Sequence, residues 1–334
     1  MYHIAVIGAG NIGRRHLQAL HSLPFEATLH VVDPAEAARA ATLGFLAEQA
    51  AQTNAPKRVA DHASAQTLPR SLDIAIVATN ADVRLEATRS LLQTTAPRFL
   101  VLEKVLARSP QELQDLWATV VSYGVPSYVN CSRRLCGGYQ ALRAELAGRT
   151  VTSLAVSGPD WGIGCNAIHF IDAFAFLLNT NDYTLHADPA LLTVKPSKRP
   201  GFYELHGRVS GVFHAALGSV PFVIDAAPAG KALPITIRAT ADEVDVLACE
   251  TTRRWHVRHA ETQWAWPPEG PQPFDLLLTS QSTAQFAESL LSYGMCTLPT
   301  LAESVLLHRP MLEALLPVFE ASLGPQPNGL CPIT

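Results

Sequence analysis

Short apolar runs alternate with longer amphipathic stretches through the first 130 residues of the chain. The apolar runs predict strands at residues 4–7, 27–32, 73–78, 98–102 and 126–130, with a shorter candidate at 58–60. The stretches between them predict helices that end near residue 22 and that cover 35–51, 82–92 and 110–123. Strands and helices in this order form a parallel sheet with helices on both faces. We therefore expect an α/β Rossmann domain, a doubly wound parallel sheet, over residues 1–125.

The pattern changes after residue 125. A short helix at 139–146, a strand at 151–157 and a mostly apolar helix at 163–178 precede a series of strands. These strands are predicted at 203–213, 221–226, 234–239, 244–250 and 255–259. Helices follow at 281–293 and 301–323, the second interrupted at Pro310 and Pro317. Residues 126–334 are expected to form an α+β domain with a mostly antiparallel sheet, and its last helices are candidates to pack back on the first domain.

The first strand leads into a glycine-rich loop, Gly8-Ala9-Gly10-Asn11-Ile12-Gly13, and then into a helix. In a dinucleotide site the first glycine allows a tight turn, the second lets the backbone approach a pyrophosphate, and the third lets the helix pack close to the strand. The N–H groups at the start of the helix then point at the anion. We expect this loop, with Asn11 and Ile12, to bind a dinucleotide. The alternatives are an ordinary glycine turn and the similar loop of S-adenosylmethionine enzymes.

Asp33 ends the second predicted strand, 20 residues after Gly13. A carboxylate at this place accepts hydrogen bonds from a ribose 2′-hydroxyl and repels a 2′-phosphate. We therefore expect NAD(H) as the cofactor in preference to NADP(H).

Two further strands end in polar residues at the sheet edge where cofactors bind. Thr79 and Asn80 follow the strand at 73–78, and they can either hydrogen-bond a cofactor or cap the next helix. Glu103 and Lys104 follow the strand at 98–102. The Lys104 ammonium can stabilise negative charge on a substrate oxygen during hydride transfer, although a lysine after a strand is more commonly a solvated surface charge. All four residues are candidate cofactor contacts.

The predicted helix at 163–178 carries Cys165, His169 and Asp172 at positions i, i+4 and i+7, which places them on one face. A histidine there can take a proton from a carbinol as the hydride leaves, and Asp172 can orient it. A core histidine hydrogen-bonded to a buried aspartate is the commoner arrangement, so the residues alone leave both interpretations open. The other histidines show no ligand spacing, and we predict no metal site.

The composition narrows the class of protein. With 334 residues, 48% hydrophobic and 16% charged, the chain is long enough for two globular domains and has no run of about 20 apolar residues for a membrane helix. Its 29 acidic and 25 basic residues give no basic surface for nucleic acid. The six cysteines form no CxxC pair, and the N-terminus has no secretory pattern. We expect reduced thiols and a cytoplasmic protein.

The order of these features resembles the Gfo/Idh/MocA oxidoreductase family, which includes glucose-fructose oxidoreductase and inositol dehydrogenases. The resemblance covers nearly the whole chain and is carried by GAGNIGRRH at the N-terminus, Thr79-Asn80, Glu103-Lys104 in place of the family's EKP, Gly124-Val125 and the H-x-x-D of His169 and Asp172. The C-terminal LPTLAESVLLHRPMLEALL is similar to the end of sugar-biosynthesis members.

The resemblance implies a Rossmann domain followed by a domain with a large open antiparallel sheet, through which members form homodimers or homotetramers. It implies NAD(P)-dependent oxidation or reduction of sugars, cyclitols or related compounds. It also implies that Lys104 is the active-site lysine and that His169 is the acid/base residue.

The chain departs from the family pattern at two places. Val105 replaces the proline of EKP, and in the signature D-x-G-x-H-x-x-D the chain has Cys165 for the first aspartate and Ala167 for the glycine. A thiol cannot anchor a sugar hydroxyl as a carboxylate does. Candidates for substrate contact here are Trp161, Cys165 and Asn166, with Asp160 as a further source of the missing polar group. We expect Cys165 to be an inert thiol and not a nucleophile.

The expected function is an NAD(H)-dependent oxidoreductase that transfers a hydride between nicotinamide and a hydroxyl or keto group of a sugar, sugar acid or nucleotide sugar. The competing expectation is a catalytically impaired cofactor-binding sensor or regulator of the same fold, which the loss of the aspartate at Cys165 favours. A methyltransferase is disfavoured by Lys104 and by the order of the two domains.

Overall fold

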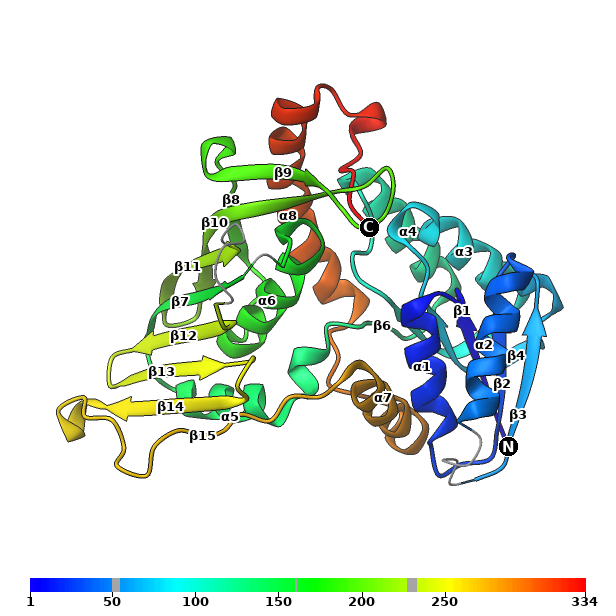
Figure 1. The fold of residues 1–334 in the computed structure, drawn as a ribbon, viewed down its shortest axis with the longest axis horizontal. Coiled ribbons are helices and arrows are strands. Elements are labelled where there is room, and N and C mark those ends of the chain that lie inside the picture. The colour runs from blue at the N-terminus through cyan, green and yellow to red at the C-terminus, as the bar shows by residue number, and fades with distance from the viewer. Residues whose placement is uncertain (50–54, 160, 227–232) are drawn as a thin grey trace. The chain divides into compact units, whose positions relative to one another are not determined.

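The computed structural model describes residues 1–49, 55–159, 161–226 and 233–334 (Figure 1). The chain divides into two compact units. The first contains Met1–Ala107, Gln111–Leu135 and Leu277–Ala302, and the second contains Arg108–Pro110, Cys136–Leu276 and Glu303–Thr334.

The first unit is built on a sheet of six parallel strands in the order β3-β2-β1-β4-β5-β6. Their bounds are β1 (Tyr2–Ile7), β2 (Ala27–Val32), β3 (Lys57–His62), β4 (Ser71–Val77), β5 (Ala96–Leu102) and β6 (Ser127–Val129). The strand order reverses direction at β1 and β4, which is where open α/β sheets bind their ligands. The predicted Rossmann fold is confirmed.

Helices connect these strands, and one more joins the unit from far along the chain. They are α1 (Asn11–His21), α2 (Glu36–Glu48), α3 (Ala81–Thr94), α4 (Pro110–Tyr123) and α7 (Thr279–Tyr293). Residues 50 and 51 of the helix predicted at 35–51 lie outside the described residues. Figure 1 shows α7 beside α1. Apolar side chains of both helices, among them Leu17, Leu20, Phe286 and Leu290, close a fully buried core over Ile4, Val6 and their neighbours on one face of the sheet.

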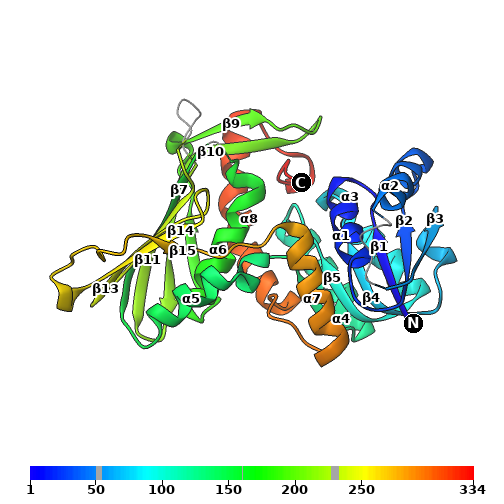
Figure 2. The ribbon, with the colours of Figure 1, turned by 60° about the horizontal axis from the view of Figure 1, so that its bottom comes forward.

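The second unit contains a nine-stranded sheet in the order β15-β14-β13-β12-β7-β11-β10-β8, with β9 paired to β10. Its strands are β7 (Val151–Gly158), β8 (Tyr183–His186), β9 (Leu192–Pro196), β10 (Tyr203–Ala215), β11 (Gly218–Ala226), β12 (Thr236–Ala241), β13 (Val244–Cys249), β14 (Arg254–His259) and β15 (Gln272–Pro273). Within the described part of this second sheet, only the β7–β11 pair is parallel. Figure 2 shows the helices α5 (Gly137–Leu146), α6 (Ile163–Leu178) and α8 (Leu301–Leu323) on one side of this sheet. The predicted α+β fold with a mostly antiparallel sheet is confirmed.

The predicted interruption of the last helix is wrong, because α8 runs through Pro310 and Pro317 without a break. A proline removes one backbone hydrogen bond from a helix interior. Here the lost bonds are outweighed by a buried apolar face whose residues are fully inaccessible: Leu307, Met311, Leu312, Leu315, Val318 and Phe319. Among the described residues, no helix combines the length and the apolar character of a membrane span.

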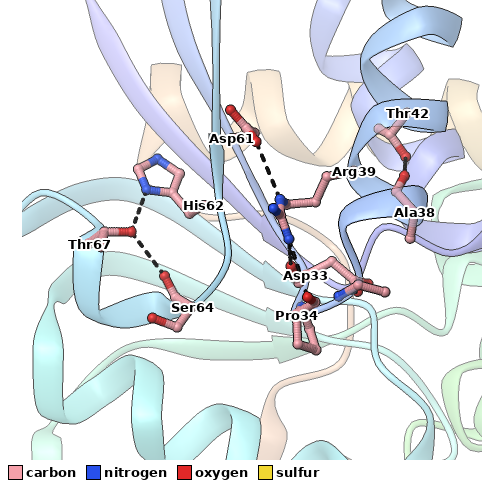
Figure 3. Close-up of polar contacts among 10 residues, drawn as sticks. Asp33, Pro34, Ala38, Arg39, Thr42, Asp61, His62, Ser64 and Thr67 are labelled. Atoms are coloured by element: carbon pink, nitrogen blue, oxygen red, sulfur yellow. Dashed lines mark hydrogen bonds and ion pairs between the residues drawn. The ribbon is translucent and has the colours of Figure 1, made fainter.

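A row of three histidines crosses the first sheet on neighbouring strands. His3 Nδ1 lies 3.1 Å from His30 Nε2, and His30 Nδ1 lies 3.0 Å from His62 Nε2. His62 Nδ1 lies 2.8 Å from the Thr67 hydroxyl, which itself donates to the Ser64 carbonyl at 3.2 Å (Figure 3). Because the Thr67 hydroxyl donates to Ser64, it must accept from His62 Nδ1. His62 Nε2 then accepts from His30 Nδ1, and His30 Nε2 accepts from His3 Nδ1. In this row His30 and His62 each accept a hydrogen bond through Nε2, which only an uncharged ring can do.

Lowering the pH should destabilise the first unit through protonation of His30. Burial, with smaller effects from His62 and His3, lowers the pKa of His30 to about 4 from 6.5. Between these values the unfolded chain binds a proton that the native state does not, so the free energy of unfolding should fall as pH drops from about 6.5 to about 4. His30→Val should make this slope shallower in urea unfolding at a series of pH values.

The control is His186→Val, which removes an exposed imidazole from β8. It should leave the slope unchanged. Equal slopes for His30→Val and the unmodified protein would contradict the assignment of this pH dependence to the histidine row.

Candidate active site

Three glycines shape the loop between β1 and α1, each under a different constraint. Gly8 adopts a φ of +102°, and a Cβ there would lie 3.0 Å from the Ala78 carbonyl oxygen. A Cβ on Gly13 would lie 1.8 Å from the Gly8 carbonyl oxygen, so the start of α1 excludes any larger residue. A Cβ on Gly10 meets no atom of the described residues within 4 Å. The fold therefore requires Gly8 and Gly13, whereas the open space at Gly10 suits the approach of a ligand.

Asp33 is held directly against this loop. Its Oδ2 accepts the Ala9 N–H at 2.8 Å, and its Oδ1 accepts the Ala35 N–H at 2.9 Å. Each carboxylate oxygen keeps a second lone pair, which a ribose hydroxyl can use.

The other predicted cofactor contacts lie at the ends of neighbouring elements. The Thr79 hydroxyl is buried and makes no hydrogen bond within the described part of the chain, a deficit that a bound ligand would satisfy. Asn80 is at the N-cap of α3, but its side chain makes no capping hydrogen bond. In the first turn of α1, Asn11 accepts from Arg14 at 2.8 Å and Ile12 is 38% exposed. The orphaned hydroxyl and the open glycine loop fit a dinucleotide.

Glu103, at the end of β5, is buried in a polar network that the sequence analysis did not identify. Its Oε1 accepts from His16 Nε2 at 2.9 Å and from the Asn130 amide at 2.5 Å. On the other side of the ring, His16 Nδ1 lies 2.8 Å from the Thr283 hydroxyl, which donates to the Thr279 carbonyl. The only sequence signal for this network is the histidine of GRRH in the first helix.

The contacts of the network lower the pKa of the buried Glu103 carboxyl group. Because the Thr283 hydroxyl donates elsewhere, His16 donates through Nδ1, and its Nε2 faces the carboxyl. Burial acts to raise the pKa of Glu103, but its contacts with His16 and Asn130 and the charge of Lys104 outweigh this, so the pKa is lowered. Glu103 is therefore ionised at neutral pH.

The backbone at Lys104 is held on one side by the buried Glu103 and on the other side by Arg84. The buried Arg84 donates hydrogen bonds to the carbonyl groups of Val105 and Thr79. The Lys104–Val105 peptide bond is cis. The backbone that carries the lysine is therefore fixed by two buried charged side chains.

The helix α6 carries the predicted acid/base residues. His169 is partly buried and Asp172 is 1% exposed, one turn further along the helix. Before the helix, the Trp161 indole nitrogen is buried and has no hydrogen-bond acceptor among the described residues. Asn166 donates to the carbonyl groups of Trp161 and Gly162, at 2.5 and 3.0 Å, so its amide caps the approach to the helix. Asp160 lies outside the described residues.

Cys165 makes polar contacts with Glu204 and Thr334 in the second unit. Its backbone N–H donates to Glu204 Oε2 at 3.2 Å, and its thiol lies 2.8 Å from the Thr334 carbonyl oxygen. Glu204 comes from β10, and it reaches the start of α6 because Gly162 has no side chain: a Cβ there would lie 2.6 Å from the carboxyl group. No local sequence pattern pointed to Glu204.

The predicted residues divide between the two units. The first contains the glycine loop, Asp33, Thr79, Asn80, Glu103 and Lys104, and the second contains Trp161, Cys165, Asn166, His169 and Asp172. Each group is brought together within its own unit.

Loss of the Glu103 carboxylate should destabilise the protein strongly. Glu103→Ala leaves the buried His16 ring nitrogen and the buried Asn130 amide without their shared partner and should cost about 3–5 kcal/mol in urea unfolding. Glu86→Ala removes an exposed ion pair with Arg89 on α3 and should cost at most about 0.5 kcal/mol. Similar losses of unfolding free energy in the two variants would show that the buried pair contributes no more to stability than an exposed ion pair does.

Alanine substitutions should separate the roles of the glycines. Gly13→Ala should cost about 3 kcal/mol of unfolding free energy through steric overlap. Gly10→Ala should melt like the unmodified protein but bind NADH at least about tenfold more weakly in a fluorescence titration. Gly44→Ala, at an exposed helical site with no atom within 4 Å, should stabilise by about 0.5–1 kcal/mol. Unchanged NADH affinity in Gly10→Ala would exclude the loop as the dinucleotide site.

Comparisons with known proteins agree with this geometry. Residues 2–131 match the Gfo/Idh/MocA model, described as an oxidoreductase family with an NAD-binding Rossmann fold. Comparison with curated proteins gave no match. Among solved structures, the chain is similar to an oxidoreductase from Agrobacterium radiobacter in complex with NAD+, L-tartaric acid and magnesium, with a TM-score of 0.67, 16% identity and 94% of each chain covered.

Two further structures share the fold. A levoglucosan dehydrogenase in complex with NADH and L-sorbose has a TM-score of 0.69 and 16% identity, covering 95% of this chain and 96% of the other. The transcriptional regulator Gal80p from Kluyveromyces lactis has a TM-score of 0.70 and 13% identity, covering 96% and 93%. The resemblance to the Gfo/Idh/MocA family seen in the sequence is confirmed: residues 2–131 match the model of this oxidoreductase family, which has an NAD-binding Rossmann fold.

Proposed function

We propose that the protein is an NAD(H)-dependent oxidoreductase that transfers a hydride between nicotinamide and a hydroxyl or keto group of a sugar, sugar acid or nucleotide sugar. The observation that carries the proposal is the fixed backbone around Lys104, between the Glu103–His16 pair and Arg84. A solvated surface lysine needs no such support. The sugar-type substrate is supported by the levoglucosan dehydrogenase, which shares the fold.

In the proposed reaction the residues of this chain move and hold protons. Bound NAD+ would supply the hydride acceptor. His169 takes the proton of the substrate hydroxyl, and Asp172 orients its ring. Lys104 donates a hydrogen bond to the same oxygen and stabilises the negative charge that develops on it as the hydride leaves. The anchored backbone lowers the cost of reorganising this donor during the reaction.

Two finer features belong to the same proposal. Asp33 makes NAD(H) the favoured cofactor, because its carboxylate repels a 2′-phosphate. The family resemblance supports assembly as a homodimer or homotetramer through the sheet of the second unit.

The second candidate function is a cofactor-binding regulator, and one observation favours it. At Cys165 the family's carboxylate is replaced by a thiol whose hydrogen bond goes to the chain itself, at Thr334. Gal80p, a transcriptional regulator, has the same fold. Such a protein would bind NAD(H) without turning over a substrate.

Substitution of Lys104 and His169 tests the catalytic proposal. Hydride transfer is followed by NADH absorbance across a panel of sugars, sugar acids and nucleotide sugars. Lys104→Ala and His169→Ala should each lower kcat by about 10²–10⁴-fold on the substrate found, while the Kd for NADH changes little. Because both groups act on one oxygen, the double variant should lose less than the product of the single losses.

The controls are Lys198→Ala and His186→Ala, which remove exposed side chains of the second unit. Both should keep full turnover. Near-normal kcat in Lys104→Ala and His169→Ala would refute the assigned roles. NADH binding without turnover on any compound would favour the regulator, and Cys165→Asp then tests whether restoring the carboxylate restores activity.

A further inference from the structure

Arg39, a basic residue that the sequence analysis did not identify, lies beside Asp33. Arg39, on α2, donates through Nη1 to the carbonyl oxygens of Asp33 and Pro34, at 2.7 and 3.3 Å (Figure 3). An arginine close to this carboxylate is the group that accommodates the 2′-phosphate in NADP-binding Rossmann folds. The chain therefore contains both the acidic residue expected with NAD and a basic residue of the kind expected with NADP.

A second acid holds this arginine. Arg39 Nε lies 3.3 Å from Oδ2 of Asp61, the penultimate residue of β3. Figure 3 shows the two side chains pointing toward one another. The Arg39 side chain is 13% exposed and that of Asp61 is 50% exposed. The carboxyl ends of the two strands are joined directly, since the Asp33 N–H donates to the His62 carbonyl at 3.1 Å. Asp61 is thus fixed beside the same strand end as Asp33.

The formal charges explain what this arrangement does. Asp33 and Asp61 each contribute −1 and Arg39 contributes +1, so the cluster has a net charge of −1 and repels a phosphate monoester. Without Asp61 the net charge would be zero. The two carbonyl contacts would still hold the guanidinium beside Asp33, and its Nη2 donates to no group in the described ranges, which leaves two N–H donors for phosphate oxygens.

We propose that Asp61 is a second determinant of cofactor choice, which neutralises Arg39 and so prevents it from binding the 2′-phosphate of NADP(H). The inference rests on the proposed NAD(H) site and adds a residue to it. Asp33 acts on the ribose directly, whereas Asp61 acts through Arg39. Both acids must change before the site favours the phosphorylated cofactor.

Binding of NADH and NADPH, each titrated by fluorescence without any substrate, tests this role. Asp61→Asn should raise the affinity for NADPH about three- to tenfold and leave that for NADH within about twofold, as expected for one charge at a partly exposed site. Adding Arg39→Gln to Asp61→Asn should cancel the gain. Asp33→Ser with Asp61→Asn should bind NADPH more tightly than NADH. The Arg39–Asp61 ion pair is partly exposed and contributes little to stability, so Asp61→Asn should fold.

The matched control is Glu36→Gln, which removes an exposed negative charge from the first turn of the same helix. It should leave the NADPH affinity unchanged. An equal gain in Glu36→Gln, or no gain in Asp61→Asn beside tight NADH binding, would overturn the role of Asp61 while leaving the proposed function intact. Failure of the unmodified protein to bind either nucleotide would instead overturn the proposed function, and the inference with it.

Discussion

The pairing of Glu103 with His16 is the constraint on which the nucleotide-binding unit depends. A carboxylate buried at this depth loses several kcal/mol of hydration, which only a charged and hydrogen-bonded partner can offset. The partners come from α1, from the residue after β6 and, through Thr283, from α7. Hydrogen bonds from the two nitrogens of the His16 ring therefore connect segments that are up to 267 positions apart. This network adds a polar contact to the apolar packing of α7 on α1, and it holds Glu103 at the end of β5.

The sequence predicts the elements of the fold well wherever their signals are local. The helix predicted at 110–123 begins at a proline and has the bounds of α4, and the apolar helix at 163–178 has the bounds of α6. The last helix was mispredicted because the cost of Pro310 and Pro317 is visible locally, whereas the compensating burial of their neighbours depends on the folded unit. Tertiary packing overrides local propensity at such positions.

The residues of the candidate site likewise differ in whether their signals are local in the sequence or depend on distant partners. The glycine loop could be found because its steric requirements lie within six consecutive residues, and Asp33 follows at a spacing that strand geometry sets. His16, Asp61 and Glu204 could not, since each acts on a residue 87, 22 or 39 positions away. Their pairing is decided by strand order and helix placement. The local sequence around a charged residue on an amphipathic element does not identify the residue with which it will pair in the folded chain.

Function on this fold is decided by such side chains and not by the backbone. Structures of an oxidoreductase and of a transcriptional regulator match the chain over at least 93% of their lengths. In the first unit, the backbone at Lys104 is held by buried side chains and Asp33 is hydrogen-bonded to the glycine loop. On α6 the motif aspartate has become Cys165, but Glu204 brings a carboxylate from β10 to the backbone N–H of that same residue. A carboxylate therefore lies beside the start of α6 although the helix itself carries none at position 165, and the sequence motif of the helix alone does not reveal it.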